Sequence, residues 1–483
     1  MPLPFGFETS TCRHAQELWA RQTLRERLTF VREARYRIAE RADALCAAVH
    51  ADVHRPATEL IATDLLPTAA ALKFLERRAA SILAPRRVPR RDRPLWLMGS
   101  RDAVHRQPLG VVGAIGTWNY PILLNVVPMA QALAAGNGVV WKPSEQTPRA
   151  AEVIRDLFSH FPPGLIQVLP ATREGGAELA EADVDHLIFT GSDVVGRKLA
   201  ARLGERLVPS TLELSGCDAM LVLADADLDL AARSAWFGLS LNRGQTCIAV
   251  RRIFVARQCY QVFVEKLRPL IEASSPMRLQ TPGQLEQASR LTAEAKTKGA
   301  AVVSHEVTEA TRHGEMFPTL LLDSTSDMQF CREACFAPVT AAVPFDSPDD
   351  AVRLANASPF GLAASIFSTN VAAAQHLALR LRAGSVIVND TLVATAHPAT
   401  PFGGRGASGW GVTQGAEGLL AMTMPQTVSV RSGRMRPHLD DAIRPDPSTG
   451  EILLGVLRAT HARGWQERFR GVRQLIRGIR RRK

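Results

Sequence analysis

Two patterns of apolar residues follow one another along the chain. Residues 13–50 and 56–82 carry apolar side chains at helical spacing, which predicts helices there. Further along, short apolar runs alternate with helical stretches, as in βαβ units. The expected strands cover residues 109–115, 138–141, 165–169, 186–189 and 211–214 in a first series, and residues 220–223, 253–255, 339–344, 363–367 and 385–388 in a second. This alternation predicts an α/β fold with two doubly wound parallel-sheet domains.

The length and composition are typical of a folded, multidomain protein. The 483 residues are too many for one ordinary core, so two or three domains are expected. Apolar residues make up 46% and charged residues 22%, which argues against disorder in the bulk of the chain. No apolar run has the length of a membrane span, and the first ten residues lack a secretory leader. We therefore expect a cytoplasmic protein.

The seven cysteines are odd in number and scattered along the chain. None belongs to a CxxC pair or to a Cys/His cluster with zinc spacing, so no metal site is predicted. We expect reduced thiols.

Most of the positive charge belongs to the C-terminus. Nine basic residues and one acid lie between residues 463 and 483, and the whole chain has a net charge of +11. In this tail, apolar residues recur at spacings of three and four, at Trp465, Phe469, Val472, Ile476 and Ile479. A helix there would be amphipathic and could contact an anionic membrane or an acidic partner. The alternative is a solvated extension with no specific role, because Gly464, Gly471 and Gly478 weaken a helix. No specific nucleic acid is expected.

The tetrad Gly244-Gln245-Thr246-Cys247 holds a candidate nucleophile. A cysteine attacks a carbonyl group as the thiolate, so its surroundings must lower the thiol pKa. An isolated cysteine is usually a small buried hydrophobe. Cys247 is therefore a candidate only together with suitable partners.

Glu213 and Asn119 are such partners. Glu213 closes an expected strand, where a carboxylate faces the crevice of an α/β sheet and could activate water. Asn119 follows another strand, and its amide could donate to an oxyanion. The alternatives are an ion-paired surface glutamate and a turn residue before Pro121. A thiol, a carboxylate and an amide are the groups needed to oxidise an aldehyde through a thioester.

Two further segments suit a dinucleotide. Gly191 and Ser192 follow a strand and open a helix, which places backbone N–H groups at an anion site. Lys142 and Glu145, either side of Ser144, end the preceding strand-like run and could hold the adenosine ribose. The glutamate would disfavour a 2′-phosphate, so NAD is favoured and NADP is not excluded.

These motifs together resemble those of the NAD(P)-dependent aldehyde dehydrogenase superfamily. The resemblance covers roughly residues 13–431. Further matching motifs occur in family order, at residues 141–148 and 224–229, at Asn356 with residues 360–364, and at residues 401–404 and 408–409.

The resemblance implies a role for each candidate residue. Cys247 is similar to the family nucleophile and Glu213 to its base, while Asn119 and the backbone N–H of Cys247 resemble the oxyanion hole. The substrate would be an aldehyde that leaves as a carboxylic acid. The implied cofactor contacts are Trp118, Lys142, Ser144, Glu145, Gly191, Ser192 and Phe336.

The resemblance also implies the domain organisation. Residues 1–94 and 109–214 would form a Rossmann-like coenzyme domain, and residues 215–414 the catalytic domain. A small β oligomerisation element would combine residues 95–108 and 415–431, giving a homodimer or homotetramer. Residues 432–462 are expected to be a linker, because residues 432–450 are rich in Arg, Asp and Pro. Residues 463–483 form the basic tail.

The chain departs from the family pattern at three places. Where the family has a second glutamate that holds the nicotinamide ribose, this chain has Ala334, after Glu333. Ser215 replaces a usual glycine, and the stretch 275–287 is shorter than the family norm. The loss at Ala334 leaves open a catalytically weak nucleotide-binding scaffold. An acyl-thioester reductase is another alternative, although Glu213 favours water as the acyl acceptor.

Overall fold

The computed structural model describes residues 9–94, 97, 99–305, 314–432, 439 and 446–481. The chain forms two compact units. The larger one comprises Met1–Leu83 and Gln107–Met424, and the smaller one comprises Ala84–Arg106 and Pro425–Lys483. In the described part of the chain, no helix is both long and apolar enough to cross a membrane.

The first sheet of the larger unit has six strands in the order β19-β7-β6-β3-β4-β5. Its strands are β3 (Val111–Ile115), β4 (Gly138–Lys142), β5 (Ile166–Val168), β6 (His186–Thr190), β7 (Ser210–Glu213) and β19 (Gly409–Trp410). All pairs are parallel except β19 with β7. The connecting helices are α6 (Leu123–Ala135), α7 (Pro148–Leu157), α8 (Arg173–Glu181) and α9 (Asp193–Glu205).

Helices cover both faces of this sheet, and its central strand β3 is apolar and buried along its whole length. Val112 and Ala114 of β3 pack into a core with α6, α7 and the N-terminal helices. The alternating residues Val111 and Ile115 pack on the other face against Leu179 of α8 and residues of α9. This is the doubly wound arrangement that the sequence predicts.

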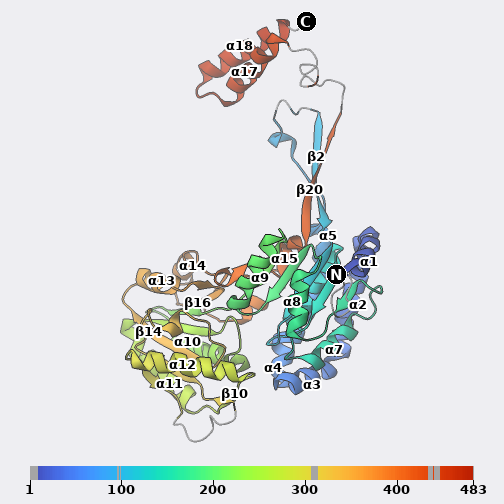
Figure 1. The fold of residues 1–483 in the computed structure, drawn as a ribbon. Helices are drawn as coiled ribbons and strands as arrows, with labels where there is room; N and C mark the ends of the chain where they lie inside the picture. The colour runs from blue at the N-terminus through green and yellow to red at the C-terminus, as the bar shows by residue number, and fades with distance from the viewer. Residues whose placement is uncertain are drawn as a thin grey trace. The chain divides into compact units, whose positions relative to one another are not determined.

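The N-terminal helical stretches are confirmed, with several breaks. They form α1 (Thr9–Arg21), α2 (Leu24–Glu40), α3 (Ala42–Val53), α4 (Ala57–Leu60), the π-helical turn η1 (Ile61–Leu65) and α5 (Leu66–Ile82). A capping box of Thr23 and Glu26 starts α2. The blue helices lie with the first sheet, away from the yellow and orange helices (Figure 1).

The second sheet has seven strands in the order β11-β13-β14-β9-β8-β16-β17. These are β8 (Asp218–Val222), β9 (Val250–Ala256), β11 (Ala301–Val303), β13 (Thr319–Leu322), β14 (Val339–Phe345), β16 (Ala363–Phe367) and β17 (Ser385–Val388). Only β11 runs antiparallel to its neighbour. The accompanying helices are α10 (Leu228–Ser240), α11 (Arg257–Glu272), α12 (Pro282–Thr297), α13 (Pro348–Asn356) and α14 (Val371–Ala378). The five predicted strands of this series are confirmed, whereas β11 and β13 were not predicted.

Short elements complete the larger unit. Two hairpin-like pairs join β10 (Met277–Arg278) to β12 (Glu315–Met316), and β15 (Phe360–Gly361) to β18 (Arg405–Gly406). The 3-10 turns are η4 (Leu241–Gly244), η6 (Gln329–Cys331) and η7 (Val393–Ala396), and α15 (Gly415–Ala421) precedes the last strand.

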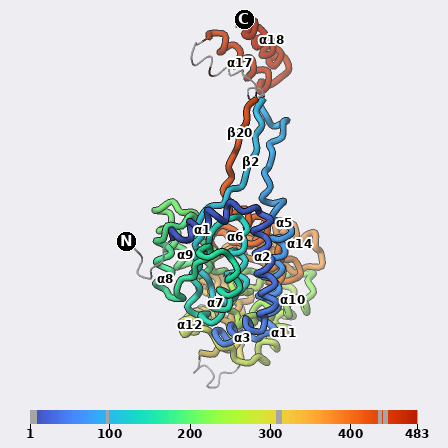
Figure 2. The backbone as a smooth tube through the Cα atoms, turned by 90° about the vertical axis from the view of Figure 1, so that its right-hand side faces the viewer, coloured from blue at the N-terminus to red at the C-terminus, as the bar shows by residue number. Residues whose placement is uncertain are grey.

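The smaller unit contains a three-stranded sheet and a pair of helices. The sheet has the order β1-β2-β20, with β1 (Arg86–Arg87), β2 (Ser100–Pro108) and β20 (Thr423–Arg431). The turn η2 (Arg90–Asp92) lies between β1 and β2. Strands β2 and β20 run side by side although they are far apart in sequence (Figure 2). This pairing brings together parts of the two segments expected to form the small β element.

The prediction of a linker at residues 432–462 is wrong for the second half of this range. Pro447–His461 forms helix α17, and Trp465–Arg481 forms helix α18. The Asp446-Pro447 pair, which suggested a linker, is a helix start, since the Asp446 side chain accepts from Ser448 N and proline fits the first helical position. Residues 433–438 and 440–445 lie outside the described residues.

Candidate active site

Four neighbouring parallel strands end at the same edge of the first sheet, in the order β7-β6-β3-β4. Glu213 ends β7, and Gly191 and Ser192 follow β6. Asn119 lies four residues beyond the end of β3, and Lys142 ends β4. Ligands of open α/β sheets bind outside this edge. The segments singled out in the sequence therefore meet along one crevice.

The segment before Cys247 has an unusual backbone. Asn242 (φ 47°), Arg243 (φ 58°) and Gly244 (φ 70°) are successive left-handed residues. The two non-glycine positions cost energy, and such strain is retained where the surroundings enforce it. Gly244 itself cannot carry a side chain, because a Cβ would lie 2.5 Å from the Ala337 oxygen.

Buried Arg251 holds this loop in place. Its guanidinium donates to the carbonyl oxygens of Gly244 and Ala337, and to that of Val339 at 3.2 Å. One side chain thus ties the loop before Cys247 to the start of β14 and the residues that precede it.

Cys247 lines two cavities at once. A polar cavity of about 300 Å³ is shared with Asn119, Glu213 and the start of α9. A larger cavity of about 550 Å³ reaches Cys247 from the side of α4, α10 and η7. All seven cysteines are free thiols, and Cys247 differs from the other six in being only partly buried. The sulfur of Cys247 is therefore accessible from both cavities, so that one molecule in each cavity could reach it.

The polar cavity gathers seven of the ten candidate site residues. They are Trp118, Asn119, Gly191, Ser192, Glu213, Cys247 and Phe336. The rings of Trp118 and Phe336 face each other edge-on with centroids 6.3 Å apart. The Ser192 hydroxyl accepts from Val195 N at 3.3 Å and so caps α9.

Glu213 is almost fully buried at this cavity. Its Oε1 accepts from the Thr413 hydroxyl at 3.2 Å, and its Oε2 has no hydrogen-bond partner. Burial raises the pKa of Glu213 to about 8, against the lowering effect of Thr413. A carboxyl with one unpaired oxygen and a pKa near neutrality suits a general base.

The pKa of the Cys247 thiol is raised to about 12, mainly by burial and further by the negative charges of Asp218 and Glu213. The thiol must therefore lose its proton to a base before it can attack a carbonyl.

Asn119 is fixed against the Cys247 loop. Its Oδ1 accepts from the Thr117 hydroxyl at 3.0 Å, and its Nδ2 donates to Gln245 O at 3.1 Å. These bonds define which end of the amide is the donor, and they leave one N–H of Nδ2 for another acceptor. The adjacent Tyr120 and Thr246 hydroxyls are also bonded, at 2.8 Å.

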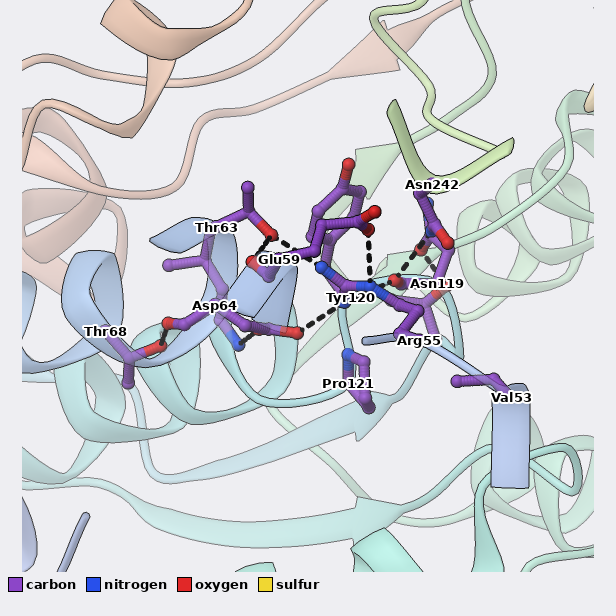
Figure 3. Close-up of polar contacts among 12 residues, drawn as sticks. Val53, Arg55, Glu59, Thr63, Asp64, Thr68, Asn119, Tyr120, Pro121 and Asn242 are labelled. Carbon is purple, nitrogen blue, oxygen red and sulfur yellow. Dashed lines mark hydrogen bonds and ion pairs between the residues drawn. The ribbon is translucent and has the colours of Figure 1, made fainter. Parts of the chain in front are cut away.

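A buried cation supports Asn119 from below, as Figure 3 shows. Arg55 is fully buried, donates from Nη1 to Asn119 O at 3.0 Å, and pairs with Asp64 at 2.9 Å and Glu59 at 3.0 Å. Its guanidinium lies 4.6 Å from the centroid of the Tyr120 ring. The sequence interpretation missed Arg55, because the i,i+4 spacing to Glu59 is typical of an ordinary helix surface and Asn119 is 64 positions away.

Lys142, Ser144 and Glu145 lie beside β3 at the end of β4. Lys142 Nζ pairs with Glu145 Oε2 at 2.8 Å. Burial alone would raise the pKa of Glu145, but the bond and charge of Lys142 hold it below its ordinary value. The Ser144 hydroxyl accepts from Gln146 N at 3.2 Å and so shapes the turn.

At the position of the missing ribose carboxylate, Ala334 lines the polar cavity. Glu333 does not replace it, because it pairs with Arg290 at 2.5 Å. Instead Gln287 of α12 lines the cavity and donates from Nε2 to Ala334 O at 3.0 Å. Ser215 lines it too, and its carbonyl oxygen accepts from the Ser408 hydroxyl at 2.8 Å.

The larger cavity is mostly apolar. Its walls include Leu123, Leu124, Phe237, Ile248, Leu392 and Phe402. The one charged side chain in its lining, Glu59, is paired with Arg55. Within the described ranges, no group of three or more His, Cys, Asp or Glu residues is arranged to hold a metal ion.

Comparison with known proteins identifies the family of this chain. The sequence model of the aldehyde dehydrogenase family matches residues 9–428. A 4,4'-diapolycopene aldehyde oxidase from Methylomonas sp is 34% identical over 427 residues, which cover 86% of this chain and 79% of the relative. A probable coniferyl aldehyde dehydrogenase from Pseudomonas aeruginosa is 31% identical, with coverage of 83% and 86%.

A solved structure is similar throughout the larger part of the chain. The Mycobacterium tuberculosis aldehyde dehydrogenase complexed with NAD+ has a TM-score of 0.82 and 29% identity, covering 88% of this chain and 90% of its own. With a family match over 420 residues of the chain and relatives above 30% identity, this protein belongs to the aldehyde dehydrogenase family, whose NAD(P)-dependent members are oxidoreductases acting on aldehydes.

Proposed function

We propose that this protein oxidises an apolar aldehyde to a carboxylic acid, with Cys247 as nucleophile and NAD as the favoured cofactor. The observation that carries this proposal is the position of Cys247 at the junction of two unlike cavities. The polar one suits the reactive end of a nicotinamide cofactor, and the apolar one suits the chain of the aldehyde.

The cofactor fits the residues present. Four strand ends, the N-terminus of α9 and the Lys142–Glu145 pair follow one edge of the sheet, as an extended dinucleotide requires. Lys142 and Glu145 would hold the adenosine ribose, and Trp118 and Phe336 would flank the polar cavity. When bound, the nicotinamide supplies a hydride acceptor. Because Glu145 is charged, it disfavours a 2′-phosphate at the ribose.

The chain's own groups account for the remaining chemistry. The thiol proton of Cys247 leaves to solvent water, and the sulfur then bonds to the aldehyde carbon. The free N–H of Asn119, with the backbone N–H of Cys247, stabilises the negative oxygen, a contact worth about 3 kcal/mol. With a bound cofactor to accept a hydride from that carbon, the carbon would be left as a thioester on Cys247. Glu213 then removes a proton from water, which attacks the thioester and releases the acid and the thiolate.

We further propose that Gln287 takes part of the role of the absent ribose carboxylate. Its Nε2 is fixed by Ala334 O, which orients its amide at the cavity wall where that carboxylate would stand. An amide oxygen can accept from a ribose hydroxyl, although without the charge of a carboxylate.

A homodimer or homotetramer formed through the small β sheet is proposed as well. Strand β20 is a sheet edge, and nearly all its residues are exposed. An exposed edge strand offers unpaired backbone groups to a second copy. Sedimentation of the full chain and of a variant with Val428→Asp and Val430→Asp, which places charges on exposed positions of this strand, would show whether β20 forms the interface.

The test of the proposed reaction is NADH formation across a series of straight-chain aldehydes. We expect kcat/KM to rise with chain length, because each CH2 placed in the apolar cavity adds roughly 0.8 kcal/mol. Cys247→Ala should abolish turnover, and Cys46→Ala, at a buried thiol of α3, should leave it unchanged. NAD binding without turnover in the wild type would favour the scaffold alternative. Turnover that needs an acyl acceptor other than water would favour the reductase alternative.

A further inference from the structure

The two C-terminal helices, α17 (Pro447–His461) and α18 (Trp465–Arg481), pack against each other as a hairpin with a turn at Gly464, and we call them the C-terminal hairpin (Figure 1). Their contact is made by glycines. A Cβ at Gly455 would lie 2.5 Å from Leu475 N, and one at Gly478 would lie 2.7 Å from the Ile452 side chain. Gly471 and Gly478, which appear unfavourable in the sequence of a helix, are therefore among the residues that let the two backbones approach.

The large apolar side chains of the hairpin are exposed. Trp465 is 76% exposed, and Phe469, Val472, Ile476 and Ile479 follow it on the same stripe of α18, each at least 40% exposed. On α17, Leu453 is 60% exposed and Leu457 is 55% exposed. A hairpin that needed these residues for its own stability would place them between the helices. Here small residues fill that contact and the large ones face outwards, which marks an interaction surface.

The same surface is strongly basic. Residues 446–481 contain eight arginines and three acids. Two of the acids, Glu451 and Glu467, pair with Arg481 at 2.7 Å and Arg470 at 2.9 Å. Arg473 lies over the Phe469 ring, 4.8 Å from its centroid, so a cation borders the apolar stripe directly. Apolar side chains beside arginines match the acyl chains and phosphate groups of a membrane surface.

We propose that the C-terminal hairpin docks on an anionic membrane, with the apolar stripe of α18 below the headgroups and the arginines among the lipid phosphates. Charge favours this occupant over a second copy of the hairpin, which would set eight arginines against eight. The apolar stripe favours it over a nucleic acid, whose backbone offers no partner for five exposed apolar side chains. The inference does not depend on the proposed reaction, because the hairpin contains none of its residues.

The test is cosedimentation of the full chain with vesicles of phosphatidylcholine, with and without phosphatidylglycerol. We expect binding to the anionic vesicles only, weakened by salt. The triple variant Trp465→Ser, Phe469→Ser and Ile476→Ser should bind roughly tenfold or more weakly, since it removes apolar area that would be buried in lipid. Its matched control is Leu379→Ser, Val371→Ser and Val262→Ser, at exposed apolar positions of the larger unit. Unchanged circular dichroism and turnover would show that both variants fold.

Three results would overturn the proposal. The wild type could remain in the supernatant with both kinds of vesicle. It could bind anionic vesicles no differently from the hairpin variant. Finally, the hairpin variant could lower the sedimentation coefficient of the lipid-free protein without changing vesicle binding, which would assign the apolar stripe to a second copy of the chain.

Discussion

Arg55 donates a hydrogen bond from its fully buried guanidinium to the backbone oxygen of Asn119, over 3.0 Å. The same guanidinium pairs with Asp64, which is also fully buried and whose Oδ1 accepts from Leu123 N at the start of α6. The residue proposed to bind the oxyanion is thus held by an ion pair that reaches it from the π-helical turn η1.

Removal of Arg55 should harm both stability and catalysis. Arg55→Met leaves Asp64 buried without its cation, and we expect about 3–5 kcal/mol lower free energy of unfolding, measured in urea. The double variant Arg55→Met with Asp64→Asn removes the orphaned charge and should recover part of that loss. If Arg55 positions Asn119, kcat of the double variant should stay low while KM changes little. Full recovery of kcat would show that Arg55 acts on stability alone.

The release of the acid should depend on pH through Glu213. Since burial raises the pKa of this carboxyl to about 8, the base form is scarce at lower pH. We expect the single-turnover rate of thioester hydrolysis to rise about tenfold per pH unit below 8 and to level off above it. A Glu213→Gln variant should hydrolyse the thioester slowly and without this rise. A profile that is flat from pH 6 to pH 9 in the wild type would contradict a role for Glu213 as base.

The stability of the fold should also depend on the ionisation of Glu213, and it should fall as the pH rises. The pKa of Glu213 is higher in the folded chain than its ordinary value of 4.5. Between pH 4.5 and about 8, the Glu213 carboxyl is ionised in the unfolded chain and protonated in the folded chain. The folded state therefore loses stability as the pH rises through this range. We expect the gain in Tm of Glu213→Gln over the wild type to be larger at pH 9 than at pH 5. An equal difference in Tm at both values would show that the carboxyl is not buried in this way.

The absence of a carboxylate at Ala334 can be tested by restoring it. Ala334→Glu should speed the hydride-transfer step, and Gln287→Ala should slow it, because small errors in cofactor position can cost roughly 100-fold. The measurement is the rate of the NADH burst, with a deuterated aldehyde to identify hydride transfer. Gln284→Ala is a poor control, since Gln284 also bonds to Gln245 and Phe336. Glu286→Ala, on the exposed side of the same helix, should leave the burst unchanged.

Glu145 should set the choice of cofactor. Glu145→Gln removes the negative charge beside Lys142 while keeping its shape, so the ratio of kcat/KM for NADP over NAD should rise. We expect an increase of roughly tenfold, as for the loss of one close like-charge contact. An unchanged ratio would show that the 2′-hydroxyl of the adenosine ribose does not lie beside Glu145.

Much of this site could be predicted from the sequence because its residues lie at strand ends. Glu213 and Gly191 each follow an apolar run that becomes a buried parallel strand, and such runs can be recognised along the chain. Parallel pairing then brings their carboxyl ends to one edge. The strands β11 and β13 were missed because they are short, with three and four residues.

The groups that support the site could not be predicted in this way. Thr413 bonds to Glu213 across 200 positions of the sequence, and Arg55 reaches Asn119 across 64. Neither contact follows a spacing of the helix or the strand. The glycines of α18 were likewise uninterpretable without α17, whose start at Asp446-Pro447 resembles a linker.

The most direct test of the account is the covalent state of Cys247. The Glu213→Gln variant should react once with an aldehyde and NAD and then stall, because water is no longer activated. Intact-mass and peptide mass spectrometry should show one acyl group per chain on Cys247, with one NADH formed per chain. No adduct despite NADH formation, or an adduct on another cysteine, would contradict the assignment of Cys247 as the nucleophile between the two cavities.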